Sequence, residues 1–331
     1  MSEPLPNPQL TQIAMSVADL PRSLRFYSEV LGFGRAGGKV IWGEFLARVQ
    51  DLGDDAQCIV WWLLGRQDFV QLEFFHHTMP AQKPRSADWR PSDIGFSRFG
   101  VAVPDFNATL ARLADWGSAP ITPPAVVDGL RRVCFPDPDG VIVELFEDGP
   151  ATPGGVRPTH WAFRPAVVYA AVSVVDLEAA RAFHVGTLGL VAEPPDKLHT
   201  PEHEALWGLA GARREVFVAR AGDIYLEVSQ YATPAPRAKP EGYLLSDQGF
   251  LNVAFSFRER PPFDAMLGRA VAAGYRANAA VAPGAGFAST YLNDGQGLTV
   301  EVFGCPREFD RLLGFEPEES FVARRAPGEV R

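Results

Sequence analysis

An internal repeat constrains the fold of this chain more than any other feature of its sequence. Residues 16–33, SVADLPRSLRFYSEVLGF, and residues 173–190, SVVDLEAARAFHVGTLGL, align without a gap at an offset of 157 positions. Each copy has a strand-like run, an Asp that can cap a helix, apolar residues three and four positions apart, and a Leu-Gly stop. The repetition predicts a chain assembled from copies of one supersecondary unit.

Two further segments repeat this order more loosely, at 99–117 and, with a longer turn, at 253–274. Four alternating strands each carry one Glu among apolar neighbours; they read FVQLEFF (69–75), GVIVELFE (140–147), DIYLEVSQ (223–230) and GLTVEVFG (297–304). The alternation is typical of strands with one face on a core. The sequence therefore predicts an α+β fold of four modules, each with strand, helix and three further strands (βαβββ).

Stretches rich in Pro, Gly and small polar residues separate the modules. Since the chain has 331 residues, two domains are expected. The predicted limits are 8–148 for the first domain (modules 8–78 and 94–148), 149–165 for a linker, 166–304 for the second domain (modules 166–231 and 247–304), and 305–331 for a C-terminal tail.

Composition excludes several classes of function. The net charge of −9 leaves no basic stripe for nucleic acid. The longest apolar run, 58–64, is too short to span a bilayer, and the first residues, MSEPLPNPQL, lack a signal-peptide pattern. A cytoplasmic protein with a small-molecule substrate or ligand, and with no nucleic acid or membrane partner, is expected. Three scattered cysteines argue against disulfides or a thiolate metal site.

Two segments, VADLPRSLRFYSEVLGF and FPDPDGVIVELFE, resemble the vicinal-oxygen-chelate (VOC) superfamily, which includes glyoxalase I, bleomycin-resistance proteins and extradiol dioxygenases. The resemblance covers about residues 10–148 strongly and 166–304 more weakly. It implies two tandem VOC (glyoxalase-like) domains, in each of which two modules form a half-open sheet. The concave face of such a sheet carries up to four metal-directed side chains, from the first and last strands of both modules.

For the first domain the resemblance selects Gln12, Glu73, Arg98 and Glu144. One class of glyoxalase I has the pattern Gln-Glu-His-Glu, so Arg98 stands where a His is expected. We expect these side chains to meet on one concave face. A guanidinium cannot ligate a metal, so pairing of Arg98 with Glu73 or Glu144 slightly favours a metal-free site. A divalent ion (Zn, Ni, Mn or Mg), if bound, is expected on Gln12, Glu73 and Glu144.

For the second domain the same rule selects Tyr169, Glu227, Asn252 and Glu301. These residues are expected to converge as substrate-binding groups without a catalytic metal, because a phenol and an amide replace both expected histidines. Several aromatic residues are candidates to line an apolar pocket, although core packing is the alternative for most; they are Trp42, Phe45, Trp61, Trp62, Phe96 and Tyr243.

The leading functional hypothesis is an enzyme of isomerase or lyase type that acts on a small compound with adjacent oxygens. Glu144 or Glu73 would remove a proton beside a carbonyl, and a metal or Arg98 would stabilise the resulting enolate. A non-catalytic binding protein of the bleomycin-resistance type is the first alternative. A ring-cleaving dioxygenase is the second, disfavoured because its two-His, one-carboxylate ligand set is missing. Both a monomer with two paired domains and a homodimer are compatible with the sequence.

Overall fold

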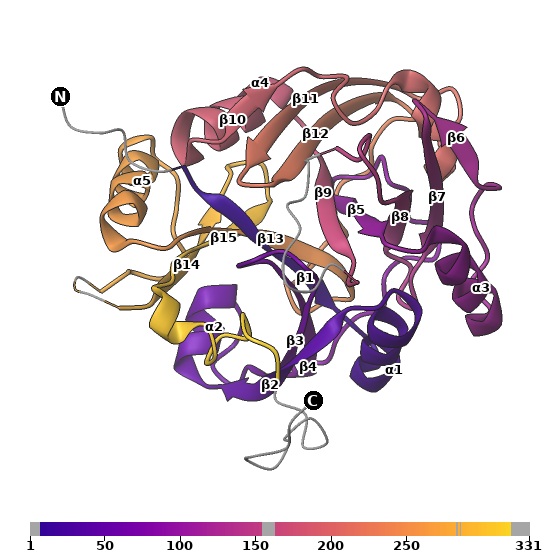
Figure 1. The fold of residues 1–331 in the computed structure, drawn as a ribbon. Helices are drawn as coiled ribbons and strands as arrows, with labels where there is room; N and C mark the ends of the chain where they lie inside the picture. Colours follow the sequence, from indigo (N-terminus) through magenta and orange to yellow (C-terminus); the bar gives the residue numbers. More distant parts are fainter. Residues whose placement is uncertain (1–6, 154–162, 283, 285, 319–331) are drawn as a thin grey trace, which may run out of the picture.

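The computed structural model describes residues 7–153, 163–282, 284 and 286–318 (Figure 1). The first module contains β1 (Gln9–Ser16), α1 (Leu20–Arg25), a π-helical turn η1 (Phe26–Val30), β2 (Gly34–Trp42), α2 (Glu44–Gln50), β3 (Gln57–Leu64) and β4 (Gln71–Met79). The second contains β5 (Gly95–Val103), α3 (Phe106–Trp116), β6 (Ala125–Val127), β7 (Leu130–Pro136) and β8 (Ile142–Glu147).

The other two modules repeat this order. The third contains β9 (Ala166–Ser173), α4 (Leu177–Arg181), η2 (Ala182–Leu188), β10 (Val191–Glu193), a 3₁₀ helix η3 (Pro201–Trp207), β11 (Arg213–Ala221) and β12 (Ile224–Thr233). The fourth contains β13 (Gly249–Phe257), α5 (Arg260–Ala272), β14 (Ala288–Asn293) and β15 (Thr299–Gly304), followed by η4 (Arg307–Phe309). The predicted α+β fold with four modules is confirmed.

The helices begin where the repeated Asp residues predict. Asp19, Asp105 and Asp176 each accept a hydrogen bond from the backbone N–H three residues later, at 2.9–3.0 Å. This satisfies one of the donors left free at a helix start. The first helix of each half then continues as a π-helical turn, and Gly189 ends the second one in a left-handed conformation.

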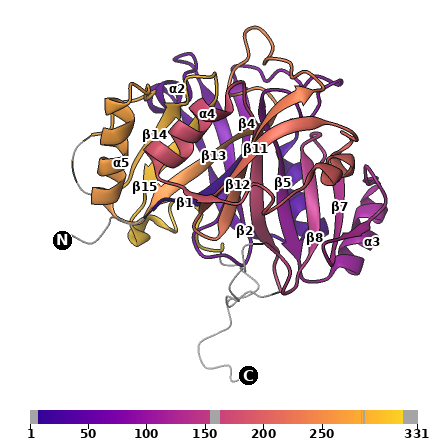
Figure 2. The ribbon, with the colours of Figure 1, turned by 90° about the horizontal axis from the view of Figure 1, so that it is seen from above.

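The strands form two sheets, and each sheet joins one module of the first predicted domain to one module of the second. The seven-stranded sheet has the order β14-β15-β13-β1-β4-β3-β2, and the eight-stranded sheet has the order β10-β11-β12-β9-β5-β8-β7-β6. The first module therefore pairs with the fourth, through antiparallel β1 and β13, and the second pairs with the third, through β5 and β9. Figures 1 and 2 show β1 and β13 side by side.

This pairing corrects our expectation that the two modules of each predicted domain share a sheet. All four modules present similar edge strands, so the pattern within a module does not select its partner. The connection 80–94 carries the chain from β4 in one sheet to β5 in the other. The predicted residue limits of the domains stay a prediction, and the predicted linker and tail lie partly outside the described residues.

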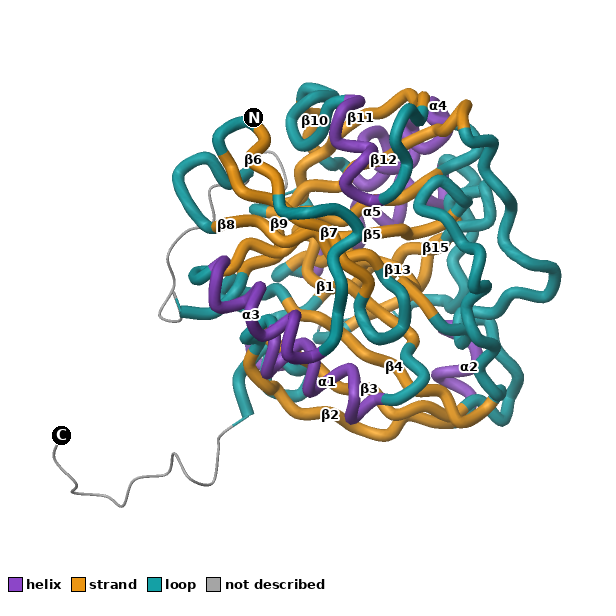
Figure 3. The backbone as a smooth tube through the Cα atoms, turned by 90° about the vertical axis from the view of Figure 1, so that its right-hand side faces the viewer, coloured by secondary structure: helices purple, strands orange, loops and turns teal. Residues whose placement is uncertain are grey.

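Each sheet has two apolar faces with different surroundings. On β4, Leu72 and Phe74 belong to the large core beneath the helices, whereas Phe75 belongs to a separate cluster on the opposite face. Figure 3 shows α1 and α3 next to each other on the outside of the strands. We call the face opposite the large core "cup A" in the seven-stranded sheet and "cup B" in the eight-stranded sheet.

Within the described ranges, no helix combines the length and the apolar composition needed to cross a membrane.

Candidate functional site

Cup A contains a pocket of about 130 Å³ lined by strands of the first and fourth modules, by α2, and by the C-terminal segment. Gln12 from β1, Glu73 from β4 and Glu301 from β15 line it. Asn252, from β13, is fully buried, and its amide lies near the hydroxyl of Tyr291, which also lines the pocket. Aromatic side chains provide much of the remaining wall; they are Phe45, Trp62, Phe75, Phe287, Phe303 and Phe315.

The two carboxylates of cup A are held by neutral hydrogen-bond donors. The indole N–H of Trp62 donates to Glu73 Oε1 at 2.8 Å, and the Gln12 amide lies 3.4 Å from the same oxygen. The Ser289 hydroxyl donates to Glu301 Oε1 at 2.7 Å. Glu73 is only 5% exposed, and its Oε2 has no hydrogen-bond partner among the described residues. One oxygen of Glu73 is therefore oriented while the other stays available.

Burial and the nearby Glu301 carboxylate raise the pKa of Glu73, and burial raises the pKa of Glu301. The Lys39 ammonium lines the same pocket and lies 5.1 Å from the centroid of the Trp62 ring. Burial lowers the pKa of Lys39, while attraction to Glu73 opposes this effect. Cup A thus contains two carboxyl groups with raised pKa values and one ammonium group.

The C-terminal segment covers one side of this pocket. The Leu313 carbonyl accepts a hydrogen bond from Gln71 Nε2 at 3.1 Å, and Phe315 packs on Phe69 with ring centroids 4.6 Å apart. A Cβ on Gly314 would lie 2.5 Å from the Trp62 ring, so only glycine allows this approach. Residues 313–315 are therefore part of the wall of cup A.

The side chains of cup A fit a divalent cation in donor type. Gln12 Oε1 is buried without a hydrogen-bond partner in the described part of the chain, as is Glu73 Oε2. Two carboxylates and an amide oxygen suit hard or borderline divalent ions. Within the described residues, no group of three or more His, Cys, Asp or Glu side chains is arranged to hold a metal. A cation here would therefore depend on amide oxygens and water as well.

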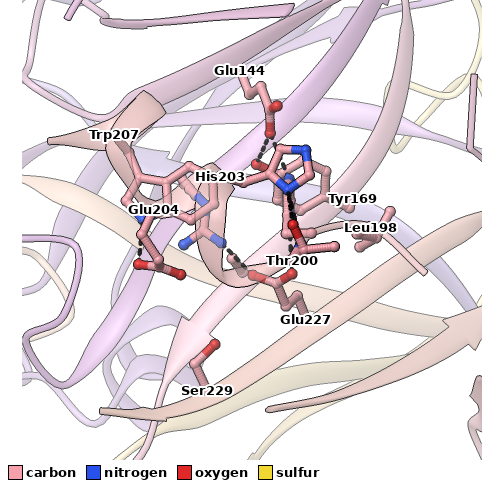
Figure 4. Close-up of polar contacts among 12 residues, drawn as sticks. Glu144, Tyr169, Leu198, Thr200, His203, Glu204, Trp207, Glu227 and Ser229 are labelled. Carbon is pink, nitrogen blue, oxygen red and sulfur yellow. Dashed lines mark hydrogen bonds and ion pairs between the residues drawn. The ribbon is translucent and has the colours of Figure 1, made fainter. Parts of the chain in front are cut away.

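Cup B is filled by charged side chains that bind one another (Figure 4). Glu144 accepts hydrogen bonds from Arg132 Nε at 2.7 Å, the Tyr169 hydroxyl at 2.5 Å and His199 Nε2 at 2.8 Å. His199 Nδ1 lies 2.6 Å from Glu227 Oε2. His199 thus bridges two carboxylates, with one ring nitrogen facing each.

Further cations complete the network of cup B. Arg98 bonds to Glu227, and its guanidinium lies 3.8 Å from the centroid of the Trp207 ring. Arg214 Nη1 lies 3.2 Å from Glu227 Oε1. Glu204 accepts hydrogen bonds from Arg214 and from Trp207, which is shown in Figure 4. Glu227 is completely buried and Arg98 is 1% exposed.

The electrostatics of cup B are the reverse of those in cup A. Burial opposes ionisation of Glu144, but Arg132 and then His199 outweigh it and lower the pKa of Glu144 below its ordinary value. Glu227 behaves alike, because Arg214, His199 and Arg98 outweigh its burial and lower its pKa. The neighbouring cations thus favour the ionised forms of Glu144 and Glu227.

The eight side chains selected from the sequence are divided between the two cups in an unexpected way. Cup A brings together Gln12 and Glu73 with Asn252 and Glu301, whereas cup B brings together Arg98 and Glu144 with Tyr169 and Glu227. Arg98 pairs with Glu227, and not with Glu73 or Glu144 as we expected. The cause is the strand pairing, since β5 lies beside β9 and β1 beside β13.

Several residues of both cups were missed by sequence reasoning. In cup B these are Arg132, His199 and Arg214, and in cup A Lys39, Ser289 and Tyr291. His199 precedes η3, whose N-cap is Thr200, and points into cup B. The repeat pairs each of these positions with a residue of different chemistry, so no motif identified them.

The fold and its sites define a tandem βαβββ protein in which one cup holds a pocket and the other is filled by ion pairs. Residues 9–145 match the family model described as the Glyoxalase/Bleomycin resistance protein/Dioxygenase superfamily. The match covers the first module and most of the second, and it confirms a VOC domain within this segment.

Solved structures share the fold over nearly the whole chain. Glyoxalase I from Zea mays has a TM-score of 0.60 at 15% identity, and the match covers 93% of this chain and 95% of that one. A putative dioxygenase from Bacillus subtilis has a TM-score of 0.58 at 14% identity, with 93% and 90% covered. At these identities the likeness concerns the fold alone. No curated protein sequence matches the chain.

Proposed function

We propose that the chain is an enzyme of isomerase or lyase type that acts on a small compound with adjacent oxygens, and that it does so in cup A. The observation that carries this proposal is the presence of Glu73 and Glu301 in one largely apolar pocket. Two carboxyl groups in such a setting can take and return a proton at neighbouring atoms. Proton transfer beside a carbonyl is the chemistry that this arrangement serves best.

Glu73 is the proposed general base. Trp62 fixes Oε1, so Oε2 is free to take a proton from the carbon beside the substrate carbonyl. Glu301, held by Ser289, is the second carboxyl group and returns a proton at the adjacent atom. The apolar wall excludes water and so protects the proton from exchange with solvent.

Positive charge beside the substrate oxygens stabilises the enolate that forms. Lys39 supplies such a charge from the chain itself. A divalent cation held by Gln12, Glu73 and Glu301 would polarise both substrate oxygens and add to this effect. Arg98 and Glu144, which we first considered for these roles, belong to the buried network of cup B, and we propose a structural role for that network.

A test that does not require the natural substrate is proton exchange in D₂O. Hydroxyacetone and related hydroxyketones are incubated with the protein, with and without Zn²⁺, Ni²⁺, Mn²⁺ or Mg²⁺, and the loss of the α-proton signal is followed by NMR. We expect exchange with the native protein, and a loss of about 100-fold or more in Glu73→Gln. Glu29→Gln, on the exposed part of the first module's helix, is the charge-matched control.

A non-catalytic ligand-binding role is the second candidate, favoured by the aromatic wall of the same pocket. Two results together would favour this role over the enzyme: Glu73→Gln still binds small aromatic compounds, and the native protein catalyses no proton exchange with any of the four metal ions or without metal. Ring cleavage by a dioxygenase is not proposed, because no histidine of the described residues lines the cup-A pocket.

A further inference from the structure

A second cavity, of about 370 Å³, lies outside both cups. It is enclosed by the connection 80–94, from β4 to β5, and the connection 234–248, from β12 to β13. None of its lining residues lines the cup-A pocket. Its volume falls within the range of small-molecule sites.

The two connections are themselves a gapless repeat. MPAQKPRSADWRPSDIGF begins at Met79 and TPAPRAKPEGYLLSDQGF begins at Thr233, at an offset of 154. Equivalent residues bind across the cavity: the backbone N–H of Lys83 donates to Asp247, and that of Arg237 donates to Asp93, both at 3.0 Å. These reciprocal bonds fix the two walls relative to each other.

Each wall presents a cation stacked on an aromatic ring. The Arg85 guanidinium lies 3.2 Å from the centroid of Trp89, and the Lys239 ammonium lies 4.1 Å from the centroid of Tyr243. Arg85 donates one N–H to the carbonyl of Gly140 at 2.7 Å. Among the described residues, neither cation has a carboxylate within 4.0 Å, the limit of an ion pair. The Lys83 ammonium also lines the cavity and donates to the carbonyl of Gly242. Arg85 and Lys239 thus add two positive charges to the lining that have no direct counter-ion.

The acidic residues of the lining do not provide that counter-ion. Asp93 is bound by Arg237 and Arg90, and Asp247 accepts two backbone N–H groups. Glu241 is exposed. Arg85 is attracted by the more distant carboxylate of Asp137, and Lys239 by that of Asp294. Each of these two carboxylates already accepts hydrogen bonds from two backbone N–H groups.

Apolar rings form another part of the wall. Phe96 and Phe250, at equivalent positions of the repeat, have ring centroids 5.1 Å apart and line the cavity. Burial lowers the pKa of Lys239 to about 8, so the charged ammonium is incompletely solvated and gains from an anionic neighbour. The lining combines flat apolar surface with unpaired positive charge.

We propose that this cavity is a binding site for a small aromatic carboxylate, whose carboxylate lies near Arg85 and Lys239 and whose ring lies against Phe96 and Phe250. Charge-assisted hydrogen bonds to both cations provide the affinity for the anion. Cup A is not suited to such a ligand, because its own carboxylates repel an anion. The site is independent of the proposed function.

Benzoate is the probe, and benzamide is its neutral counterpart of similar size. Binding to the full chain is measured by isothermal titration calorimetry at pH 7. We expect one benzoate per chain and at least about tenfold weaker binding of benzamide. Lys239→Met and Arg85→Met should each weaken benzoate binding about tenfold or more, because each removes one charged hydrogen-bond donor. Lys197→Met, which removes an exposed lysine outside the cavity, should leave binding within about twofold.

Equal binding of benzoate and benzamide, or full benzoate affinity in Lys239→Met, would overturn the proposal. A second measurement uses the native cavity, in case these variants fail to fold. The chain has four lysines, Lys39, Lys83, Lys197 and Lys239. After ¹³C-dimethylation each lysine gives an NMR signal, and the signals are assigned by replacing the lysines with Met. Benzoate should raise the pKa of the Lys239 signal and leave the Lys39 and Lys197 signals unchanged, and an unchanged Lys239 pKa at saturating benzoate refutes the site.

Discussion

Glutamates at equivalent positions of the two cups should respond in opposite ways to the same substitution. In cup B, Glu144 is completely buried and contacts Arg132, Tyr169 and His199 within 2.8 Å. Glu144→Gln keeps the shape of the side chain but leaves Arg132 buried without its partner. Removing one member of a buried ion pair costs about 3–5 kcal/mol. For a chain of 331 residues, the melting temperature should fall by roughly 4–7 °C.

In cup A, Glu73 has no ion-pair partner within 4.0 Å in the described part of the chain, and the repulsion from Glu301 is removed by Glu73→Gln. The amide oxygen can still accept from Trp62. We therefore expect this variant to stay within about 1 kcal/mol of the native protein, or to be more stable than it, as is common for residues kept for function.

Both variants are compared by calorimetric and circular-dichroism melting in the presence of EDTA, so that bound metal does not contribute. Near-ultraviolet circular dichroism serves as the check of native packing. Equal melting temperatures for Glu144→Gln and the native protein, or an equal loss in both variants, would refute the assignment of cup B to structure and cup A to function.

Three further outcomes follow from the same contacts. The folded-state pKa values of Glu144 and Glu227 lie below the ordinary 4.5. The stability that these two residues contribute is therefore complete above pH 4.5 and is lost as the pH falls below it. The melting temperature should drop over this pH range, and the drop should be smaller in Glu144→Gln. Gly314→Ala places a Cβ against Trp62, which should cost about 1–3 kcal/mol in a melting experiment and increase acrylamide quenching of tryptophan fluorescence. Burial raises the pKa of the three thiols, Cys58, Cys134 and Cys305, and the pKa reaches about 12 for Cys58 and Cys305. DTNB at pH 8 should therefore react slowly with the folded protein and should react with all three thiols after unfolding.

The fold was largely predictable from the sequence because its signals are local. The Asp caps, the spacing of apolar residues and the strand alternation depend on neighbours along the chain, and they predicted the α+β fold that the structure has. The alternation also put Glu73 on the face opposite Leu72 and Phe74, where the structure has it.

The composition of each site was less predictable, since it depends on which modules pair. First-strand edges of all four modules are similar, and β1 could pair with β5 or β13 without any change in its own pattern. The choice of β13 brings Glu301 beside Glu73 and moves Arg98 to Glu227. His199 was missed for a related reason, because it lies in a loop segment whose counterpart in the repeat has no histidine.

The central claim is that cup A, and not cup B, receives the small oxygenated compound. Acetohydroxamate carries two adjacent oxygens and is small enough to probe a pocket of about 130 Å³, and a crystal structure of the full chain grown with it tests the claim most directly. We expect the ligand between Glu73 and Glu301, with its oxygens toward Gln12, and an unchanged Arg98–Glu227 pair. Ligand density in cup B, with that pair broken and cup A without ligand, would contradict it.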